Sequence, residues 1–469
     1  MKTTLLIAGI TATLLTSCSA ARSVRGTSVG TRPKNVIVIS IDGLRPEFYL
    51  DSTYSAPNLK KMKLNGAYSE GAITVYPSST FPNHATLATG TTPAKHGVVS
   101  NTLFDLEKGP SKNWYWQASH LKVPAIWDVA KQSGKTVAIF GWPVSVGAEA
   151  DWIVPEIFSP DGIDHDKNWK LTLRETDPIF MSELQKITTV KHITSSEDYD
   201  RWMAESAIHV IRKHQPDLTL LHFRGLDEIQ HSTGPDSHAT VKAVEQVDAL
   251  LGEVLSALDP EKTMILVVGD HGFERVTMEL HLNAFFQSRG WVTTRNGKIE
   301  QWRVLAHPNG NQAPIYIKDP ALLPAVLASL KDLEKREGIE LTAYDQKQLK
   351  AMAAFPEALL AVDAPEGYVI GSAVAGPVVR RKNREGGTHG ASPLRKSMKT
   401  GLLLIGPGIR PNTPLPEVHL VDVAPTLADA LGLTLKSEGK PLHRVPAARL
   451  ECDFEYFHPC AVVSTIAQD

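Results

Sequence analysis

The segment NVIVISIDG, residues 35–43, is a short and almost continuous run of β-branched apolar residues that ends at Asp42 and Gly43. Such a run predicts a parallel strand that is buried on both faces. Because Gly43 ends the strand, Asp42 falls at its carboxyl end. Ligand sites in open α/β sheets lie at that end, so Asp42 is a candidate site residue.

The same pattern recurs along the chain, with strand-like runs alternating with helical periodicity. We expect further strands at 136–140, 218–223, 264–268 and 401–405, and helices at 123–131, 200–214, 239–258 and 424–431. This alternation predicts an α/β fold with a mostly parallel central sheet and helices on both faces.

The alternation breaks between about residues 275 and 385, where charge is mixed and Pro and Gly are scattered. A strand at 313–317 and a helix at 320–335 are expected there. We predict that this region is an insertion that forms a cap over the site. The catalytic domain would then span 34–435, with 436–469 as a C-terminal tail.

The N-terminal sequence is typical of a targeting segment. Lys2 precedes an apolar stretch, Leu5 to Leu15, that is too short to span a bilayer. Leu15-Thr16-Ser17-Cys18 resembles a bacterial lipobox, which predicts a signal peptide at 1–18, a lipid anchor on Cys18 and a tether at 19–33. Ordinary cleavage after Ala20 is the alternative. Either route predicts export to the periplasm or cell surface, and Ser19 favours an outer-membrane lipoprotein.

The net charge of the chain bears on which kind of partner the protein could bind. The chain has 469 residues and a net charge of −2, so no basic surface indicates nucleic acid binding.

The cysteines besides Cys18 are Cys452 and Cys460. In an exported protein they could form a small disulfide loop or stay as free thiols.

Further metal-ligand residue types lie in short segments marked by Gly or Pro. Asp227 and His231 are four residues apart and would share a helix face. Asp270 and His271 follow a predicted strand, and His389 lies among glycines. With Asp42 these residues supply three Asp and three His, which is what two zinc ions would need. Thr80, just before an expected helix start, is a candidate nucleophile.

The order of these segments resembles that of a known enzyme family. They are Ile41-Asp42-Gly43, Thr80-Phe81-Pro82-Asn83-His84, Asn101 after His96-Gly97, Asp227 and His231 with Gly234-Pro235, Asp270-His271-Gly272, and Thr388-His389-Gly390. From about residue 36 to 433 the chain resembles the nucleotide pyrophosphatase/phosphodiesterase family of the alkaline phosphatase superfamily. The Thr-Phe-Pro-Asn-His segment is the most specific part. Phe140-Gly141-Trp142-Pro143 also resembles a Phe-Trp-Pro segment of the family.

The resemblance implies an alkaline-phosphatase-like fold and a role for each residue. Thr80 would attack phosphorus and form a phospho-threonine intermediate. One zinc ion would be bound by Asp42, Asp270, His271 and the Thr80 oxygen. The other, which activates water, would be bound by Asp227, His231 and His389. Asn101 would stabilise charge on a non-bridging oxygen, and Phe81 resembles the family's base-stacking aromatic residue.

The chain departs from the family beside Asp227. A Tyr commonly stands five residues before this Asp, where the chain has His222, and Leu226 and Gln230 replace the usual Pro and Gly. We expect a substrate-binding set of Phe81, Asn101, Trp142 and His222, and a small-molecule phosphodiester or nucleotide substrate. A lipid-like, sugar or other diester leaving group stays open.

Three other functions fit the sequence less well than a phosphodiesterase does. A phosphomonoesterase or phosphonoacetate-type hydrolase needs an additional Arg or Lys for the phosphoryl group, and only Lys167 and Lys170 lie in a candidate region. A zinc-binding lipoprotein without catalysis does not account for Thr80 together with Asn101. A sulfatase is disfavoured because its Cys/Ser-x-Pro-x-Arg segment is absent. The mixed His and Asp ligands favour zinc.

Overall fold

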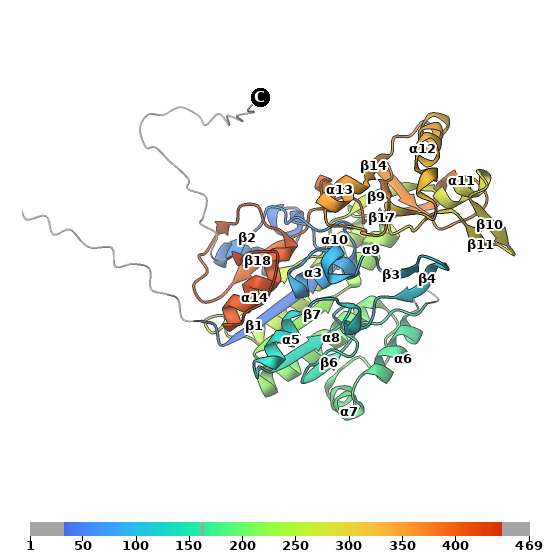
Figure 1. Ribbon diagram of the computed structural model, residues 1–469. Helices are drawn as coiled ribbons and strands as arrows, with labels where there is room; N and C mark the ends of the chain where they lie inside the picture. The colour runs from blue at the N-terminus through green and yellow to red at the C-terminus, as the bar shows by residue number, and fades with distance from the viewer. Residues whose placement is uncertain (1–31, 161–163, 443–469) are drawn as a thin grey trace, which may run out of the picture.

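The core of the protein is a central sheet with the strand order β19-β2-β18-β8-β1-β7-β5-β6. The computed structural model describes residues 32–160 and 164–442 (Figure 1). The strands are β1 (Asn35–Ile41), β2 (Ala67–Tyr68), β5 (Val137–Phe140), β6 (Trp152–Val154), β7 (Leu218–Phe223), β8 (Thr263–Val268), β18 (Leu402–Ile405) and β19 (Thr413–Pro414). The neighbours from β8 to β6 are all parallel, whereas β18 runs antiparallel to β8 and β2. The predicted mostly parallel α/β fold is therefore confirmed.

Strand β1 lies between β7 and β8, and its side chains alternate between two apolar clusters. Ile37 and Ile39 pack on one face, and Val36 and Val38 on the other. The first face is covered by α2 (Pro57–Asn65), α7 (Pro178–Ile187), α8 (Ser196–His214) and α10 (His238–Ser256). The second is covered by α3 (Thr80–Thr89), α5 (Ile126–Gln132) and α14 (Val423–Leu431). This double burial explains why β1 has no polar alternation.

Each expected core strand and helix is present, with ends that shift by a few residues. Helix α8 begins earlier than its periodicity predicted, because the Ser195 side chain accepts a hydrogen bond from the Asp198 backbone N–H and caps the helix. Short elements complete this part of the chain: α1 (Glu47–Leu50), α4 (Pro93–His96), the hairpin β3 (Thr102–Asp105) and β4 (Gly109–Trp114), α6 (His165–Glu175) and α9 (Gly225–Thr233).

The region predicted as a cap has its own apolar cluster, which includes Phe285, Phe286 and Phe355. Its elements are β9 (Glu274–Leu280), α11 (Leu282–Ser288), β10 (Val292–Arg295), β11 (Lys298–Trp302), β12 (Val304–Ala306), β13 (Gln312–Ile317), α12 (Leu323–Glu337), β14 (Thr342–Asp345), α13 (Gln346–Ala351), β15 (Leu360–Asp363), β16 (Gly367–Ile370) and β17 (Val379–Thr388). In Figure 1 its elements α11, α12, β10 and β11 stand at one end of the molecule. The domain boundaries stay predictions.

The predicted signal peptide with Cys18, nearly all of the tether, and Cys452 and Cys460 lie outside the described residues. Within residues 32–160 and 164–442, no helix combines the length and apolar character needed to cross a membrane.

We predict that Ile39→Ala lowers the free energy of unfolding by about 2–5 kcal/mol, because it leaves a cavity in the central strand. Ile39 has 0% exposed surface. The control is Leu64→Ala on α2, whose side chain is 58% exposed and which should cost less than about 0.5 kcal/mol. Urea denaturation of both variants measures the difference. Equal losses would contradict this account of the core.

Candidate active site

Seven residues that are far apart in sequence meet at the carboxyl ends of β1, β7 and β8. Asp42 follows β1, Asp270 and His271 follow β8, and Asp227 and His231 lie on α9, which follows β7. His389 follows β17, and Thr80 is the first residue of α3. The predicted ligand residues and the predicted nucleophile therefore form one cluster.

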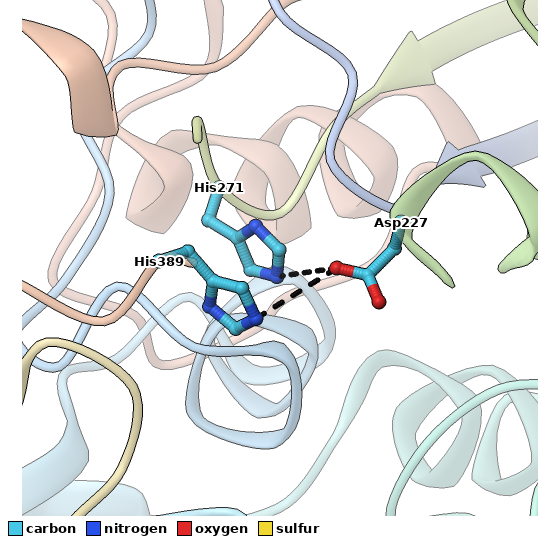
Figure 2. Close-up of side chains that lie close together, drawn as sticks. All are labelled: Asp227, His271 and His389. Atoms are coloured by element: carbon cyan, nitrogen blue, oxygen red, sulfur yellow. Dashed lines mark ion pairs between the residues drawn. The ribbon is translucent and has the colours of Figure 1, made fainter. Parts of the chain in front are cut away.

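The cluster contains two groups that could each hold a metal ion. In the first, the Asp42 group, His271 Nε2 lies 3.1 Å from Asp42 Oδ1 and 3.2 Å from Asp270 Oδ2. In the second, the Asp227 group, Asp227 Oδ1 lies 3.9 Å from His271 Nε2 and 3.7 Å from His389 Nε2 (Figure 2). His231 Nε2 is 3.4 Å from the same oxygen. His271 belongs to both groups, whereas the resemblance implied that it binds only the first metal ion.

One oxygen of each carboxylate is buried without a hydrogen-bond partner among the described residues. These oxygens are Asp42 Oδ1, Asp227 Oδ1 and Asp270 Oδ2. The other oxygen of Asp270 accepts hydrogen bonds from the backbone N–H groups of Gly43 and His271, each 3.0 Å long. A buried carboxylate oxygen without a partner is costly. A cation bound between these oxygens would remove that cost, so the residues fit a metal site.

The three imidazoles are oriented by backbone carbonyl groups. Nδ1 lies 3.2 Å from Gly272 O in His271, 3.0 Å from Gly387 O in His231 and 3.0 Å from Ser78 O in His389. A carbonyl oxygen can only accept, so each Nδ1 carries the proton and each Nε2 presents a lone pair to the cluster. Protein metal sites commonly hold their histidines in this way.

The charge states of the cluster follow from its burial. Burial raises the pKa of Asp270 to about 7, and the Asp42 charge adds to this rise. Burial and the charges of Asp42 and Asp270 raise the pKa of Asp227 well above its usual range. Burial also lowers the pKa of His231 to about 4. Asp270 and Asp42 raise the pKa of His271 against its burial, whereas burial lowers that of His389. The neutral His231 and His389 cannot offset the crowded carboxylates, so an additional positive charge would stabilise the cluster.

Thr80 places its hydroxyl beside the cluster, with Oγ1 3.3 Å from His271 Nε2. Its neighbour Phe81 donates its backbone N–H to Asn101 Oδ1 at 3.0 Å. Because this contact uses the amide oxygen, Asn101 keeps its Nδ2 group as a donor. The arrangement suits the predicted role of Asn101 beside the nucleophile.

Three residues predicted to bind substrate have no exposed surface. Phe81, Trp142 and His222 are each 0% exposed. Trp142 packs edge-on against His84, with ring centroids 4.9 Å apart. Other side chains therefore enclose these three rings in this structure, and their assignment to substrate contact stays a prediction.

The aromatic surface beside the nucleophile belongs to two other residues. Phe81 is covered by Trp114 and Phe158, with ring centroids 5.3 and 6.3 Å away. Trp114 and Phe158 stack on each other at 4.5 Å and are partly exposed. The sequence does not show that these two rings meet, because β4 and the loop after β6 come together only in the folded chain.

His222 contacts the candidate metal ligand Asp42 through the carboxylate oxygen that does not face the cluster. Its Nε2 lies 3.3 Å from Asp42 Oδ2, and its Nδ1 lies 3.0 Å from Gly141 O and 3.3 Å from Glu156 Oε2. Burial opposes the charged form of His222, but Glu156 and Asp42 raise its pKa well above the usual range. His222 thus holds one oxygen of Asp42 and leaves the other for the cluster. Glu156 was missed because nothing near it in sequence marks a site.

Known proteins resemble the chain over most of its length. Residues 36–392 match the family described as type I phosphodiesterase / nucleotide pyrophosphatase. A venom phosphodiesterase of Crotalus durissus collilineatus is 26% identical over 254 residues, which cover 52% of this chain and 27% of the relative. Human ectonucleotide pyrophosphatase/phosphodiesterase family member 1 is 22% identical over 429 residues, which cover 85% of this chain and 40% of the relative. The chain therefore spans less than half the length of these relatives.

Solved structures support the fold. An inactive variant of murine ectonucleotide pyrophosphatase/phosphodiesterase 5, in complex with AMP, has a TM-score of 0.63 at 19% identity and covers 87% of this chain and 97% of its own. The human form of that protein has a TM-score of 0.61 at 18% identity. These structures share the alkaline-phosphatase-like fold. The family match over residues 36–392 establishes that this chain belongs to the type I phosphodiesterase/nucleotide pyrophosphatase family of the alkaline phosphatase superfamily.

Proposed function

We propose that this protein is a di-zinc phosphodiesterase that hydrolyses phosphodiester or phosphoanhydride bonds of nucleotides or related diesters. The observation that carries the proposal is the position of Thr80 Oγ1, 3.3 Å from His271 Nε2. The same nitrogen lies within 4 Å of three buried carboxylate oxygens that lack hydrogen-bond partners among the described residues. A hydroxyl nucleophile next to a cation site is the arrangement that phosphoryl transfer requires.

The metal ligands are proposed from the two groups of the cluster. Asp42, Asp270, His271 and the Thr80 oxygen would hold one zinc ion, and Asp227, His231 and His389 the other. Mixed carboxylate and imidazole donors suit zinc better than magnesium, which prefers oxygen alone. When bound, the two ions would favour the ionised forms of Thr80 and of water and stabilise charge on the attacking and leaving oxygens.

The protein's own residues would carry the reaction in two displacements. Thr80 Oγ loses its proton and attacks phosphorus, the bond to the leaving oxygen breaks, and the phosphoryl group is held on Thr80. Water then attacks the same phosphorus, and the Thr80 oxygen leaves and regains a proton. Asn101 Nδ2 would donate to a non-bridging oxygen as its charge grows.

Nucleotide diesters are the proposed substrate class. Family membership supports this choice, as does the AMP complex of the structurally similar murine protein. The partly exposed rings of Trp114 and Phe158 would border the leaving group or nucleoside. We also propose that the chain acts outside the cytoplasm, anchored through Cys18, on the grounds of its N-terminal sequence alone.

A monoesterase is the weaker proposal, because its expected cationic residues are engaged elsewhere. Lys167 Nζ lies 3.7 Å from Asp164, and Lys170 Nζ lies 2.6 Å from Asp166. Both lysines lie on α6 and are more than half exposed. Neither is a partner for the second negative charge, which a phosphomonoester carries and a diester lacks.

The test compares kcat/KM of zinc-loaded protein on matched p-nitrophenyl substrates. We expect the thymidine 5′-monophosphate diester and bis-p-nitrophenyl phosphate to exceed p-nitrophenyl phosphate by about 10³, or about 4 kcal/mol of transition-state discrimination. Thr80→Ala should abolish turnover and keep the zinc content. A preference for the monoester, or turnover by Thr80→Ala, would contradict the proposal.

His222→Gln should weaken the zinc affinity of the Asp42 group by about 10–100-fold, because it removes a residue that orients a ligand. His281→Gln is the matched control, since His281 is also buried but contacts Glu279 at 3.2 Å in the cap region. Competition with a fluorescent chelator measures the affinities. The role of His222 is refuted if both variants bind zinc like the unmodified protein.

A further inference from the structure

A buried polar group lies where the cap region meets the candidate active site, and its centre is Asp363. The group, called the Asp363 group, consists of Tyr76, Glu274, Asp363, Ser392 and Arg395. Asp363 is the last residue of β15 and has 0% exposed surface. A buried carboxylate needs hydrogen-bond donors or a positive charge around it. The donors to Asp363 come from segments that carry active-site residues.

One oxygen of Asp363 holds the segment that leads to the nucleophile. The Tyr76 hydroxyl donates to Asp363 Oδ1 over 2.8 Å, and Tyr76 is itself 0% exposed. From Tyr76 the chain continues through Ser78, whose carbonyl oxygen lies 3.0 Å from His389 Nδ1, to Thr80 at the start of α3. The position of the chain before Thr80 therefore depends on a residue of the cap region.

The other oxygen of Asp363 holds the loop that follows His389. The Ser392 backbone N–H donates to Asp363 Oδ2 over 2.9 Å. The cap region also holds His389 directly, since the Asn311 backbone N–H donates to the His389 carbonyl oxygen over 3.1 Å. A Cβ atom added to Gly310 would lie only 1.7 Å from the same oxygen, so this close approach requires a glycine.

The remaining members of the group connect Asp363 to the segment that carries His271. Arg395 Nε lies 3.9 Å from Asp363 Oδ2, and another nitrogen of the same guanidinium donates to Glu274 Oε1 over 2.9 Å. Glu274 is the first residue of β9 and closely follows His271. Burial raises the pKa of Asp363 to about 6, and the Ser392 N–H and Arg395 oppose this rise. Asp363 is therefore ionised at neutral pH and can accept hydrogen bonds on both oxygens.

We propose that Asp363 is a positioning residue through which the cap region sets the position of Thr80 relative to His389. This inference rests on the proposed function. The two hydrogen bonds of the carboxylate act on either side of the contact between Ser78 and His389. Loss of the carboxylate frees both segments, so the Thr80 hydroxyl and the metal ligand lose their alignment. A misplacement of about 1 Å can lower the rate of a chemical step by about 10².

The first experiment measures the hydrolysis of bis-p-nitrophenyl phosphate by the zinc-saturated protein. We expect Asp363→Ala to lower kcat at least about tenfold and to change KM less than about twofold, because the aromatic rings proposed to border the substrate lie on other segments. Asp363→Asn should recover most of the loss, since its amide keeps one acceptor for the Ser392 N–H and can donate to the Tyr76 hydroxyl. The matched control is Asp248→Ala, which should leave kcat within about twofold. Asp248 is 1% exposed and accepts the Leu59 backbone N–H over 2.8 Å, which joins α10 to α2.

Tyr76→Phe is a second variant, and it removes only the hydroxyl that donates to Asp363. It should lower kcat at least about threefold in the unmodified protein. In the Asp363→Ala background it should cost less than about twofold, because both changes break the same hydrogen bond. Tyr49→Phe is its control and should leave kcat within about twofold. Tyr49 is 2% exposed, and its hydroxyl donates to the Ser69 carbonyl oxygen rather than to Asp363.

Hydrogen–deuterium exchange tests the positioning separately from activity. In Asp363→Ala, the backbone amides of residues 75–80 and 389–393 should exchange at least about tenfold faster than in the unmodified protein, because both segments lose a buried attachment. Asp248→Ala should leave the exchange of these two segments unchanged.

Equal losses of kcat in Asp363→Ala and Asp248→Ala would overturn the proposal, as would recovery of Asp363→Ala in excess zinc, since the carboxylate would then act on folding or on metal binding. Full additivity of Tyr76→Phe with Asp363→Ala, or unchanged exchange in both segments, would overturn it too. Should Asp363→Ala fail to fold, a Tyr76→Phe variant as active as Tyr49→Phe overturns it. If the unmodified protein hydrolyses no diester, the proposed function fails, and a catalytic role for Asp363 fails with it.

Discussion

The structure depends on the gathering of three buried carboxylates and three imidazoles at one end of a parallel sheet. Asp42, Asp227 and Asp270 each have an oxygen with no hydrogen-bond partner in the described part of the chain. Burial and the Asp42 charge raise the pKa of Asp270 to about 7. Such a cluster is costly unless positive charge enters it, and bound metal ions supply that charge while creating the means to activate oxygen nucleophiles. The stability of the site and its chemistry therefore have one physical origin.

The rest of the fold serves to hold that cluster. Parallel strands deliver Asp42 and Asp270 to the same edge, because β1 and β8 are neighbours in register. The carbonyl groups of Gly272, Gly387 and Ser78 turn the three imidazoles inward. Behind them, His222 and Glu156 form a buried polar support for Asp42.

Much of this arrangement could be predicted from the sequence. Buried strands are marked by β-branched runs, and candidate ligands follow directly where those runs end, so Asp42 and Asp270 were found by local pattern. The burial of Phe81 and Trp142 was not predicted, because local sequence does not show which other residues cover a ring. Glu156 and Trp114 were not predicted for the same reason: each reaches the site through tertiary packing, Glu156 from a loop and Trp114 from a hairpin.

Anomalous diffraction from zinc-grown crystals, recorded above and below the zinc absorption edge, tests the two-metal site most directly. The account predicts two zinc peaks per chain, one among Asp42, Asp270 and His271 and the other among Asp227, His231 and His389. A single peak, or peaks away from these carboxylate oxygens, would contradict it.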